Sequence, residues 1–185
     1  YRGHTIVSMP PPSSGGIILS EMLNILKEID LTKIGHNSAQ YLHILTESMR
    51  RAYADRANYL GDPDFNEDMP IKKLMSKEHA ADLRNSINMN QKSESDPARF
   101  AQLYESEETT HFSVVDKDGN MVSLTYTLEF GYGSHIVVRG AGFLLNNEMG
   151  DFNAVPGLTN LSGRIGTTPN QIRPEQRMLS SMTPT

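Results

Sequence analysis

The sequence contains no cysteine, so disulfide bonds and thiolate-bound metal sites are excluded. Its apolar runs fall short of the ~18 residues that a membrane-spanning helix requires, and no membrane segment is expected in this chain. Basic residues are scattered, and the net charge of the 185 residues is −5. This balance argues against a nucleic-acid-binding surface and a polybasic membrane patch. With 21% charged residues, the composition is otherwise that of an ordinary globular protein.

Histidines are few and isolated. The six of them occur without HxxH or HExxH spacing, so the sequence predicts no metal site, and no cofactor is expected. His111 lies in a predicted strand, where we expect it to pack or to form a hydrogen bond rather than to act as a general base. The glycine-rich stretch GYGSHIVVRGAG lacks the strand–turn–helix context of a phosphate-binding loop.

The first half of the chain is predicted to be helical. After PPPSSGG, where Ser13 or Ser14 can cap a helix, apolar residues recur at helical spacing from Ile18 to Ile29. Ser38 is a second cap candidate, and it precedes a long helix that ends at GDPDF. The apolar face expected for this long helix comprises Leu42, Leu45, Met49, Tyr53 and Leu60.

Arg56 is expected at the solvent-exposed end of the long helix. A third helix is predicted from about Ile71 to Ile87, although its apolar pattern is weaker. The polar residues between this helix and Glu108 are expected to form a long exposed loop. SSMTPT, at the other end of the chain, is expected to begin a strand, and we therefore expect a piece of a longer protein.

The chain changes character after Glu108. TTHFSVVD and NMVSLTYTLEF are strand patterns on either side of KDG, which is a hairpin signal. A three-residue loop with Gly119 at a positive-φ position pairs Asp116 with Asn120. The same register places Thr109 opposite Thr127 on the neighbouring strand. A two-residue loop would instead put the two hydroxyls on different faces.

The Thr109–Thr127 pair has two interpretations. Both residues can be ordinary strand residues, hydrogen-bonded across the sheet. Alternatively, the chain is cleaved between Glu108 and Thr109, so that the free α-amino group of Thr109, with a pKa near neutrality, takes the proton from its own hydroxyl. The Thr109 hydroxyl can break this bond itself, and Thr127 can orient it. The residues alone leave both interpretations open.

Several stretches of the chain resemble one family. TTHFSVVDKDGN, LTYTLEFGYG, GFLLNNEMGDFN and LSSMTPT together resemble the γ-glutamyltransferase family of N-terminal-nucleophile hydrolases. Upstream, YRGHTIVSMPPPSSGGI and YADRANYLGDPDF resemble the end of that family's large subunit. The resemblance is collinear over the whole chain. It implies an α+β fragment of a four-layer α-β-β-α fold, one structural domain in which residues 1–108 belong to the large subunit and 109–185 to the small one.

The resemblance also implies an activity. A precursor cleaves itself into two subunits that form a heterodimer, and the new N-terminal Thr109 is the nucleophile, supported by Thr127. It takes the γ-glutamyl group of glutathione or a related compound as an acyl-enzyme and passes it to water or to the amine of an amino acid or peptide. The implied location is extracellular or periplasmic. No nucleic acid is involved.

Substrate-binding residues follow from the same resemblance. The γ-glutamyl group carries an α-ammonium and an α-carboxylate, each of which needs a charged or polar partner. The positions that match the ammonium site are Glu129, Glu148 and Asp151, and those that match the carboxylate site are Ser180 and Ser181.

The chain departs from the family pattern in several places. Glu129 and Glu148 stand where many relatives carry Asn and Gln, and Ser162 stands in the expected lid (Pro156 to Thr167) where some carry an aromatic residue. A substrate-binding arginine belongs upstream of Tyr1 and an oxyanion-hole Gly-Gly beyond Thr185. An oxyanion donor contributes ~3 kcal/mol to lowering the barrier, so this piece alone is expected to be weak or inactive.

Three alternatives remain beside this reading. Two keep the fold and change the substrate, giving an acylase for β-lactam side chains or a depolymerase for poly-γ-glutamate. The third is a relative that has lost self-processing and acts as a binding or structural subunit. The three carboxylates favour a substrate with a free α-ammonium, and therefore a terminal γ-glutamyl group.

Overall fold

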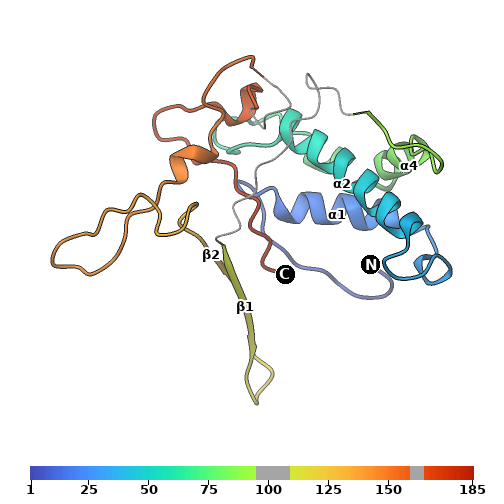
Figure 1. Cartoon of the computed structure of the whole chain (residues 1–185), viewed down its shortest axis with the longest axis horizontal. Coiled ribbons are helices and arrows are strands. Elements are labelled where there is room, and N and C mark those ends of the chain that lie inside the picture. The colour runs from blue at the N-terminus through green and yellow to red at the C-terminus, as the bar shows by residue number, and fades with distance from the viewer. Residues whose placement is uncertain (95–108, 159–164) are drawn as a thin grey trace.

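The computed structural model describes residues 1–94, 109–158 and 165–185. Helices occupy the first half of the chain and a two-stranded sheet follows (Figure 1), which confirms the expected α+β class. Within the described residues, no helix is long and apolar enough to cross a membrane. The order of elements is α1 (Gly15–Leu26), η1 (Leu31–Lys33), α2 (Ala39–Tyr59), α3 (Ile71–Leu74), α4 (Lys77–Asn85), β1 (Thr110–Val115), β2 (Met121–Tyr126), η2 (Glu148–Asp151) and η3 (Thr168–Asn170).

The two predicted helix starts are confirmed, but their serines act differently. Ser38 precedes α2, and its side-chain oxygen accepts a hydrogen bond from the backbone N–H of Tyr41 at 3.1 Å. Ser14 precedes α1 without making such a cap. Its hydroxyl instead donates to the backbone oxygen of Ser180 at 2.8 Å. The start of α1 is therefore connected to the far end of the chain.

The buried face of α2 differs from the prediction. Leu42 and Met49 are 48% and 41% exposed, and Arg56, expected in solvent, is only 8% exposed. The prediction was wrong because it followed apolar periodicity, whereas much of the buried face is polar and charged. Its residues are Ile44, Glu47, Ser48, Arg51, Ala52, Arg56 and Ala57.

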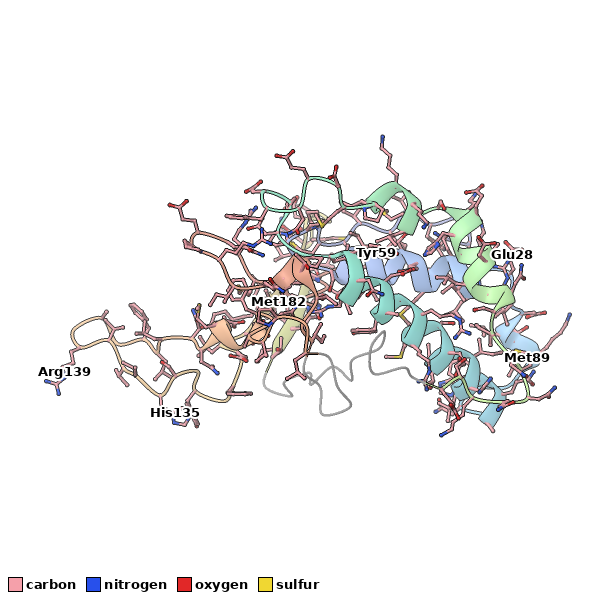
Figure 2. All side chains as sticks on the ribbon, turned by 90° about the horizontal axis from the view of Figure 1, so that it is seen from above. Glu28, Tyr59, Met89, His135, Arg139 and Met182 are labelled. Atoms are coloured by element: carbon pink, nitrogen blue, oxygen red, sulfur yellow. The ribbon has the colours of Figure 1, made fainter. Side chains whose placement is uncertain are left out.

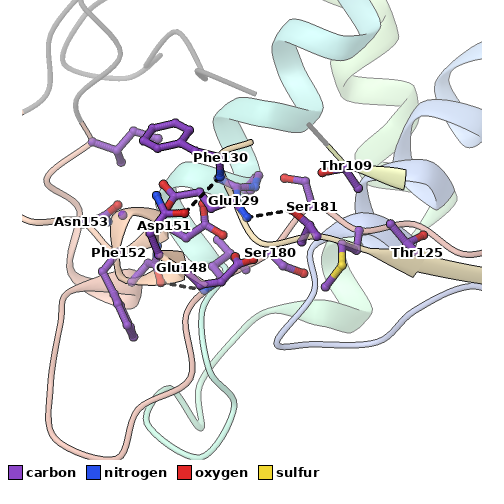
Figure 3. A pocket seen from close by; sticks show the side chains of 18 of the residues that line it. Thr109, Thr125, Glu129, Phe130, Glu148, Asp151, Phe152, Asn153, Ser180 and Ser181 are labelled. Carbon is purple, nitrogen blue, oxygen red and sulfur yellow. Dashed lines mark hydrogen bonds between the residues drawn. The ribbon is translucent and has the colours of Figure 1, made fainter. Parts of the chain in front are cut away.

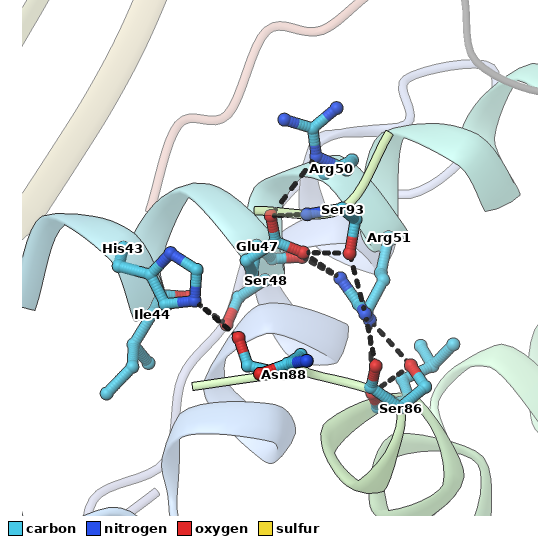
Figure 4. A network of polar contacts seen from close by, with 10 residues as sticks. His43, Ile44, Glu47, Ser48, Arg50, Arg51, Ser86, Asn88 and Ser93 are labelled. Atoms are coloured by element: carbon cyan, nitrogen blue, oxygen red, sulfur yellow. Dashed lines mark hydrogen bonds and ion pairs between the residues drawn. The ribbon is translucent and has the colours of Figure 1, made fainter. Parts of the chain in front are cut away.

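A network of polar contacts stabilises this charged face (Figure 4). The Glu47 carboxylate accepts hydrogen bonds from Arg51 Nη1 at 2.6 Å and from the Ser93 backbone N–H at 3.0 Å. Arg51 also donates to the Ser86 hydroxyl at 2.8 Å, just beyond α4. Burial raises the pKa of Glu47, but hydrogen bonds from Ser93 and Arg51 outweigh burial and lower it to about 2. The network therefore holds the end of α4 against α2.

The single helix predicted from about Ile71 to Ile87 is wrong, because the chain forms two helices there. α3 ends at Leu74, and α4 begins after Ser76. The Ser76 side chain accepts a hydrogen bond from the backbone N–H of His79 at 3.1 Å, so it caps a new helix rather than continuing the old one. The break turns α4 back onto α1.

The predicted hairpin register is confirmed. The strands pair antiparallel from Thr110 with Tyr126 to Val115 with Met121. The Asp116 backbone N–H donates to the Asn120 carbonyl at 3.0 Å, and Gly119 has the positive φ of 83° that the three-residue loop requires.

Both faces of the hairpin are largely open to solvent, because within the described residues its sheet has two strands only. The strand predicted at SSMTPT forms only an isolated bridge between Ser180 and Ser13, and a second isolated bridge joins Val137 to Leu144. The segment after β2 projects away from the helices, with His135 and Arg139 near its tip (Figure 2).

A small apolar core supports the C-terminal segment. Leu179 is 2% exposed and packs with Ile17 of α1, Leu60 at the end of α2 and Leu74 of α3. Beside it, buried Asp62 accepts hydrogen bonds from the Arg177 backbone N–H at 2.8 Å and from Arg177 Nε at 3.0 Å. Residues 177–181 are therefore anchored on the helices.

Candidate active site

One pocket brings together all seven residues singled out from the sequence and described by the structure. It has a volume of about 890 Å³ and lies between the base of the hairpin, η2 and the C-terminal segment. Clefts of this size bind small molecules. In Figure 3 the carboxylates stand on one side of the pocket and Thr109 on the other. The seven residues are Thr109, Thr127, Glu129, Glu148, Asp151, Ser180 and Ser181. Their roles remain predictions.

The two threonines lie at the open end of the hairpin. Thr109 precedes β1 and is exposed, and extending the strand register by one residue places it opposite Thr127. The Thr127 hydroxyl accepts a hydrogen bond from the backbone N–H of Glu129 at 3.0 Å. That bond leaves the hydroxyl's own proton available for a second partner.

His111, which lies next to the threonines, forms hydrogen bonds as expected. Its Nδ1 is 2.8 Å from the Thr125 hydroxyl, and its Nε2 is 3.3 Å from the Ser113 hydroxyl. The imidazole is thereby held along the strand. The other partner of the predicted cleavage bond, Glu108, and Ser162 of the predicted lid lie outside the described residues.

Three acids, which we call the acidic cluster (Glu129, Glu148 and Asp151), form one wall of the pocket. Glu129 has a φ of 73°, a left-handed conformation that is rare for a residue with a side chain. Its carboxylate fits against Gly150, where any Cβ would collide with it. Glycine at position 150 therefore allows the close approach of the two loops.

Burial and mutual repulsion favour the neutral forms of these acids. Burial, followed by interactions with Asp151 and Glu129, raises the pKa of Glu148 to about 7. Burial and the charge of Asp151 also raise the pKa of Glu129. Burial raises the pKa of Asp151, partly offset by a hydrogen bond with Glu148 and the charge of Arg56. A cation in the pocket would favour the ionised forms of all three.

Ser180 and Ser181, the serine pair, are held by the backbone around them. The Ser180 carbonyl accepts hydrogen bonds from the backbone N–H of Ser14 at 2.9 Å and from its hydroxyl at 2.8 Å. The Ser181 carbonyl accepts a hydrogen bond from the Thr183 hydroxyl at 2.7 Å. These bonds use main-chain oxygens and leave the side-chain hydroxyls of these two pocket-lining residues able to donate.

Sequence reasoning missed Arg56 and Asn170, which also line the pocket. Arg56 Nε donates to the Ser14 hydroxyl at 2.9 Å. Buried Asn170 donates to the Asp151 carbonyl at 2.7 Å and accepts from the Leu179 N–H at 2.9 Å. It therefore joins the acidic cluster to the serine pair. Arg56 was placed in solvent because it follows an apolar stripe, and Asn170 lies in a loop-like stretch without any pattern.

The pocket combines three chemical capabilities. A strand-end hydroxyl is a potential nucleophile, the acidic cluster attracts a cationic group, and the serine pair can donate hydrogen bonds to an anion. Such a site is suited to transferring an acyl group that carries an ammonium and a carboxylate of its own.

Comparison with known proteins gives the family. A family model described as gamma-glutamyltranspeptidase matches residues 1–185. The chain therefore belongs to the γ-glutamyltranspeptidase family, as the motifs predicted. It is 48% identical, over 187 aligned residues, to the glutathione hydrolase proenzyme of Escherichia coli (strain K12). That alignment covers 100% of this chain and 32% of the relative, so the chain spans about a third of the length of such curated relatives.

The chain is also similar to two further proteins. The acylase ACY 1 proenzyme of Pseudomonas sp. (strain SE83) is 38% identical over 184 residues, covering 100% of this chain and 31% of that protein. A solved structure named LmbA2991HD has a TM-score of 0.59 and 24% identity, covering 95% of this chain and 30% of that one. At this identity the likeness concerns the fold alone.

Proposed function

We propose that the full-length protein is a self-processing γ-glutamyl acyltransferase and hydrolase. The observation that carries this proposal is the shared pocket of the Thr109 hydroxyl, the acidic cluster and the serine pair. Membership of the γ-glutamyltranspeptidase family supports it. The donors are glutathione or other γ-glutamyl compounds, and the acceptor is water or the amine of an amino acid or peptide.

The first step is cleavage of the precursor. The Thr109 hydroxyl attacks the Glu108 carbonyl carbon, the Glu108–Thr109 amide bond breaks, and an ester to the Thr109 oxygen forms. Water then hydrolyses the ester, which leaves a carboxylate on Glu108 and a free amino group on Thr109. This amino group is the base that takes the hydroxyl proton in later turnovers. Thr127 orients the hydroxyl from the neighbouring strand.

The second step is acyl transfer. The acidic cluster binds the α-ammonium of the donor and the serine pair binds its α-carboxylate, which brings the γ-carbonyl to Thr109. The Thr109 oxygen attacks this carbonyl, and the amine of the donor leaves with a proton. The acceptor then attacks the resulting ester and releases the γ-glutamyl group from Thr109.

The proposal extends to the assembled protein. Residues 1–108 and 109–185 belong to two subunits of a heterodimer with a four-layer α-β-β-α fold. The exposed apolar residues of the hairpin, such as Phe112 at 47% and Val114 at 53%, support a larger sheet around it. An extracellular or periplasmic location rests on the family resemblance alone.

A second candidate function is an acylase that accepts donors without an α-ammonium. It is favoured by the 38% identity to an acylase proenzyme. The acidic cluster favours the first proposal, because three carboxylates have no use in binding an acyl chain that lacks a cationic group. Turnover of γ-glutamyl-anilide and glutaryl-anilide by the full-length protein separates the two, since glutaryl lacks only the ammonium. Preference for glutaryl would contradict our proposal.

The cleavage step is tested by intact mass. We expect the full-length protein to mature into two chains separated between Glu108 and Thr109, and the Thr109→Ala variant to remain a single chain. A wild-type protein that stays uncut, or a Thr109→Ala variant that is cut at the same bond, would overturn the mechanism.

A further inference from the structure

A second cluster of ionisable groups lies between the helices, outside the pocket. Glu21 of α1, Asp55 of α2 and His79 of α4 place their ligand atoms within 4.8 Å of one another. His79 Nε2 is 2.6 Å from Asp55 Oδ2 and 3.3 Å from Glu21 Oε1. None of the three lines the pocket. Helices α1, α2 and α4 therefore each contribute one ionisable side chain to the same cluster.

Glu21 is the unusual member of this cluster. Its side chain is 1% exposed, and within the described residues neither carboxylate oxygen has a hydrogen-bond partner. His79 Nε2 approaches Glu21 without forming a hydrogen bond to it, because that nitrogen forms its short hydrogen bond with Asp55. A buried carboxylate without hydrogen bonds is costly. A cation at this place would offset that cost.

One imidazolium does not balance the charges. Two carboxylates carry two negative charges, whereas a protonated His79 supplies a single positive one. A divalent cation bound by neutral His79 and both carboxylates would leave the cluster electrically neutral.

We propose that Glu21, Asp55 and His79 form a binding site for a divalent transition metal of the Zn²⁺ class. One imidazole nitrogen and two carboxylate oxygens are a ligand set that Zn²⁺ accepts at about 2.0–2.2 Å. Ca²⁺ and Mg²⁺ fit less well, since they favour oxygen ligands and a larger number of them. The ligand atoms, which lie within 4.8 Å of one another, would reach these bond lengths to the ion through small side-chain rotations.

The surroundings supply an entry path and a firm frame. The side chains of Asp55 and His79 are each 14% exposed, so an ion and a fourth ligand, water, can reach the site from solvent. The helix of His79 is fixed at its start by the Ser76 cap. Because the ligands come from three helices, the bound ion would hold α1, α2 and α4 together, and its effect falls on stability rather than on acyl transfer.

The sequence predicted no metal site because its histidines lack paired spacing. That rule applies to ligands on one helix or one loop, whereas these three residues meet only after the helices pack. Asp55 belongs to the YADR stretch, directly before Arg56, but of these two residues only Arg56 lines the pocket. The site and the acyl-transfer pocket are therefore separable by mutation.

Zinc binding by the full-length protein tests the proposal. After treatment with a chelator and dialysis, the protein is titrated with ZnCl₂ alone by calorimetry, and bound zinc is quantified by mass spectrometry. We expect one Zn²⁺ to bind through this site and to raise the Tm. His79→Ala and Glu21→Gln should each weaken its affinity at least about 100-fold, more than loss of an outer partner does. His43→Ala, a histidine on α2 outside the cluster, should bind as the wild type does.

Two results would overturn the proposal. One is unchanged zinc affinity in His79→Ala. The other is a wild-type protein that binds no zinc while Glu21→Gln matches its Tm, which would show that a proton alone neutralises Glu21. Cleavage at Thr109 is followed in the same preparations, so failure of this site and failure of the proposed function give different results.

Discussion

The Ser14 hydroxyl donates a hydrogen bond of 2.8 Å to the backbone carbonyl of Ser180. The same hydroxyl accepts a bond of 2.9 Å from Arg56 Nε. Ser14, the residue that precedes α1, therefore fixes the position of Ser180, and Arg56 of α2 in turn fixes the position of Ser14. None of these contacts needs to touch a bound donor, yet together they set where its carboxylate would bind.

Replacing Ser14 with alanine should weaken donor binding. The variant loses the hydroxyl's hydrogen bonds with Ser180 and Arg56. Loss of the bond to Ser180, worth ~1 kcal/mol, loosens that residue, so we expect KM for γ-glutamyl-anilide to rise roughly fivefold while kcat changes less. Steady-state kinetics of the full-length protein measure both. Ser20→Ala, within α1, is the matched control. An unchanged KM in Ser14→Ala would rule out this positioning role.

Thr127→Ala should slow maturation. If the Thr127 hydroxyl orients Thr109, its loss removes one hydrogen bond from the cleavage transition state and lowers the rate about tenfold, equivalent to ~1.4 kcal/mol. The time course of precursor and product chains, followed by intact mass, gives this rate. Ser113→Ala on β1 serves as the control. Cleavage of Thr127→Ala at the wild-type rate would defeat the prediction.

Donor binding should depend on pH through Glu148. Burial and the neighbouring acids raise its pKa to about 7, so the acidic cluster gains negative charge as the pH rises through that value. A donor ammonium then binds more tightly, and kcat/KM for γ-glutamyl-anilide should increase between about pH 6 and 8.

The Glu148→Gln variant isolates this effect. Because the amide does not titrate, the rise of kcat/KM near pH 7 should flatten, whereas any contribution from the Thr109 amino group remains. Glutaryl-anilide, which lacks the ammonium, provides a second control in the wild-type protein. If Glu148→Gln keeps the full wild-type pH profile, Glu148 does not titrate in donor binding.

Asp62 should contribute to stability at neutral pH and lose this contribution in acid. Hydrogen bonds from Arg177 outweigh burial and lower the pKa of Asp62 below its ordinary 3.8. A carboxyl with a lowered folded pKa stabilises the protein above the unfolded value, and this stabilisation disappears as the pH falls through the folded pKa. Asp62→Asn should therefore cost about 1–2 kcal/mol at pH 7.

Chemical denaturation of the full-length protein at several pH values measures this difference. It should begin to shrink as the pH falls below about 4, the ordinary value of the unfolded carboxyl, and should keep shrinking until the pH is below the lowered folded pKa. Asp64→Asn is the comparison, because Asp64 contacts the same arginine from an exposed position. A gap between wild type and Asp62→Asn that persists unchanged in acid would contradict the assignment.

Local signals in the sequence predicted the parts of the fold that depend on local chemistry. Gly119 in the KDG turn determined the hairpin register, and Ser38 marked the start of α2. The buried face of α2 could not be predicted, because Glu47 and Arg51 are tolerated inside only through partners from distant segments. A prediction from apolar periodicity assigns every charged residue to the solvent-exposed face, including charges that are paired and buried.

The site was predictable to a similar extent. The family motifs predicted residues that line the pocket, but they did not predict the contacts that fix the positions of those residues. Asn170 connects two walls of the pocket through backbone groups, a contact for which no residue pattern exists. The contact of the Glu129 carboxylate with Gly150, which approaches from another loop, likewise has no local pattern that would predict it.

The hairpin turn has a consequence for Thr109 at the opposite end of the strand. Because each residue of β1 faces a fixed partner on β2, the length of the turn sets the register of the two strands, and therefore the residue that faces Thr109. Deleting Lys117 from the exposed loop would shift the whole ladder by one place and turn the Thr109 hydroxyl away from Thr127. A surface change far from the pocket would thus separate the two hydroxyls without altering either residue.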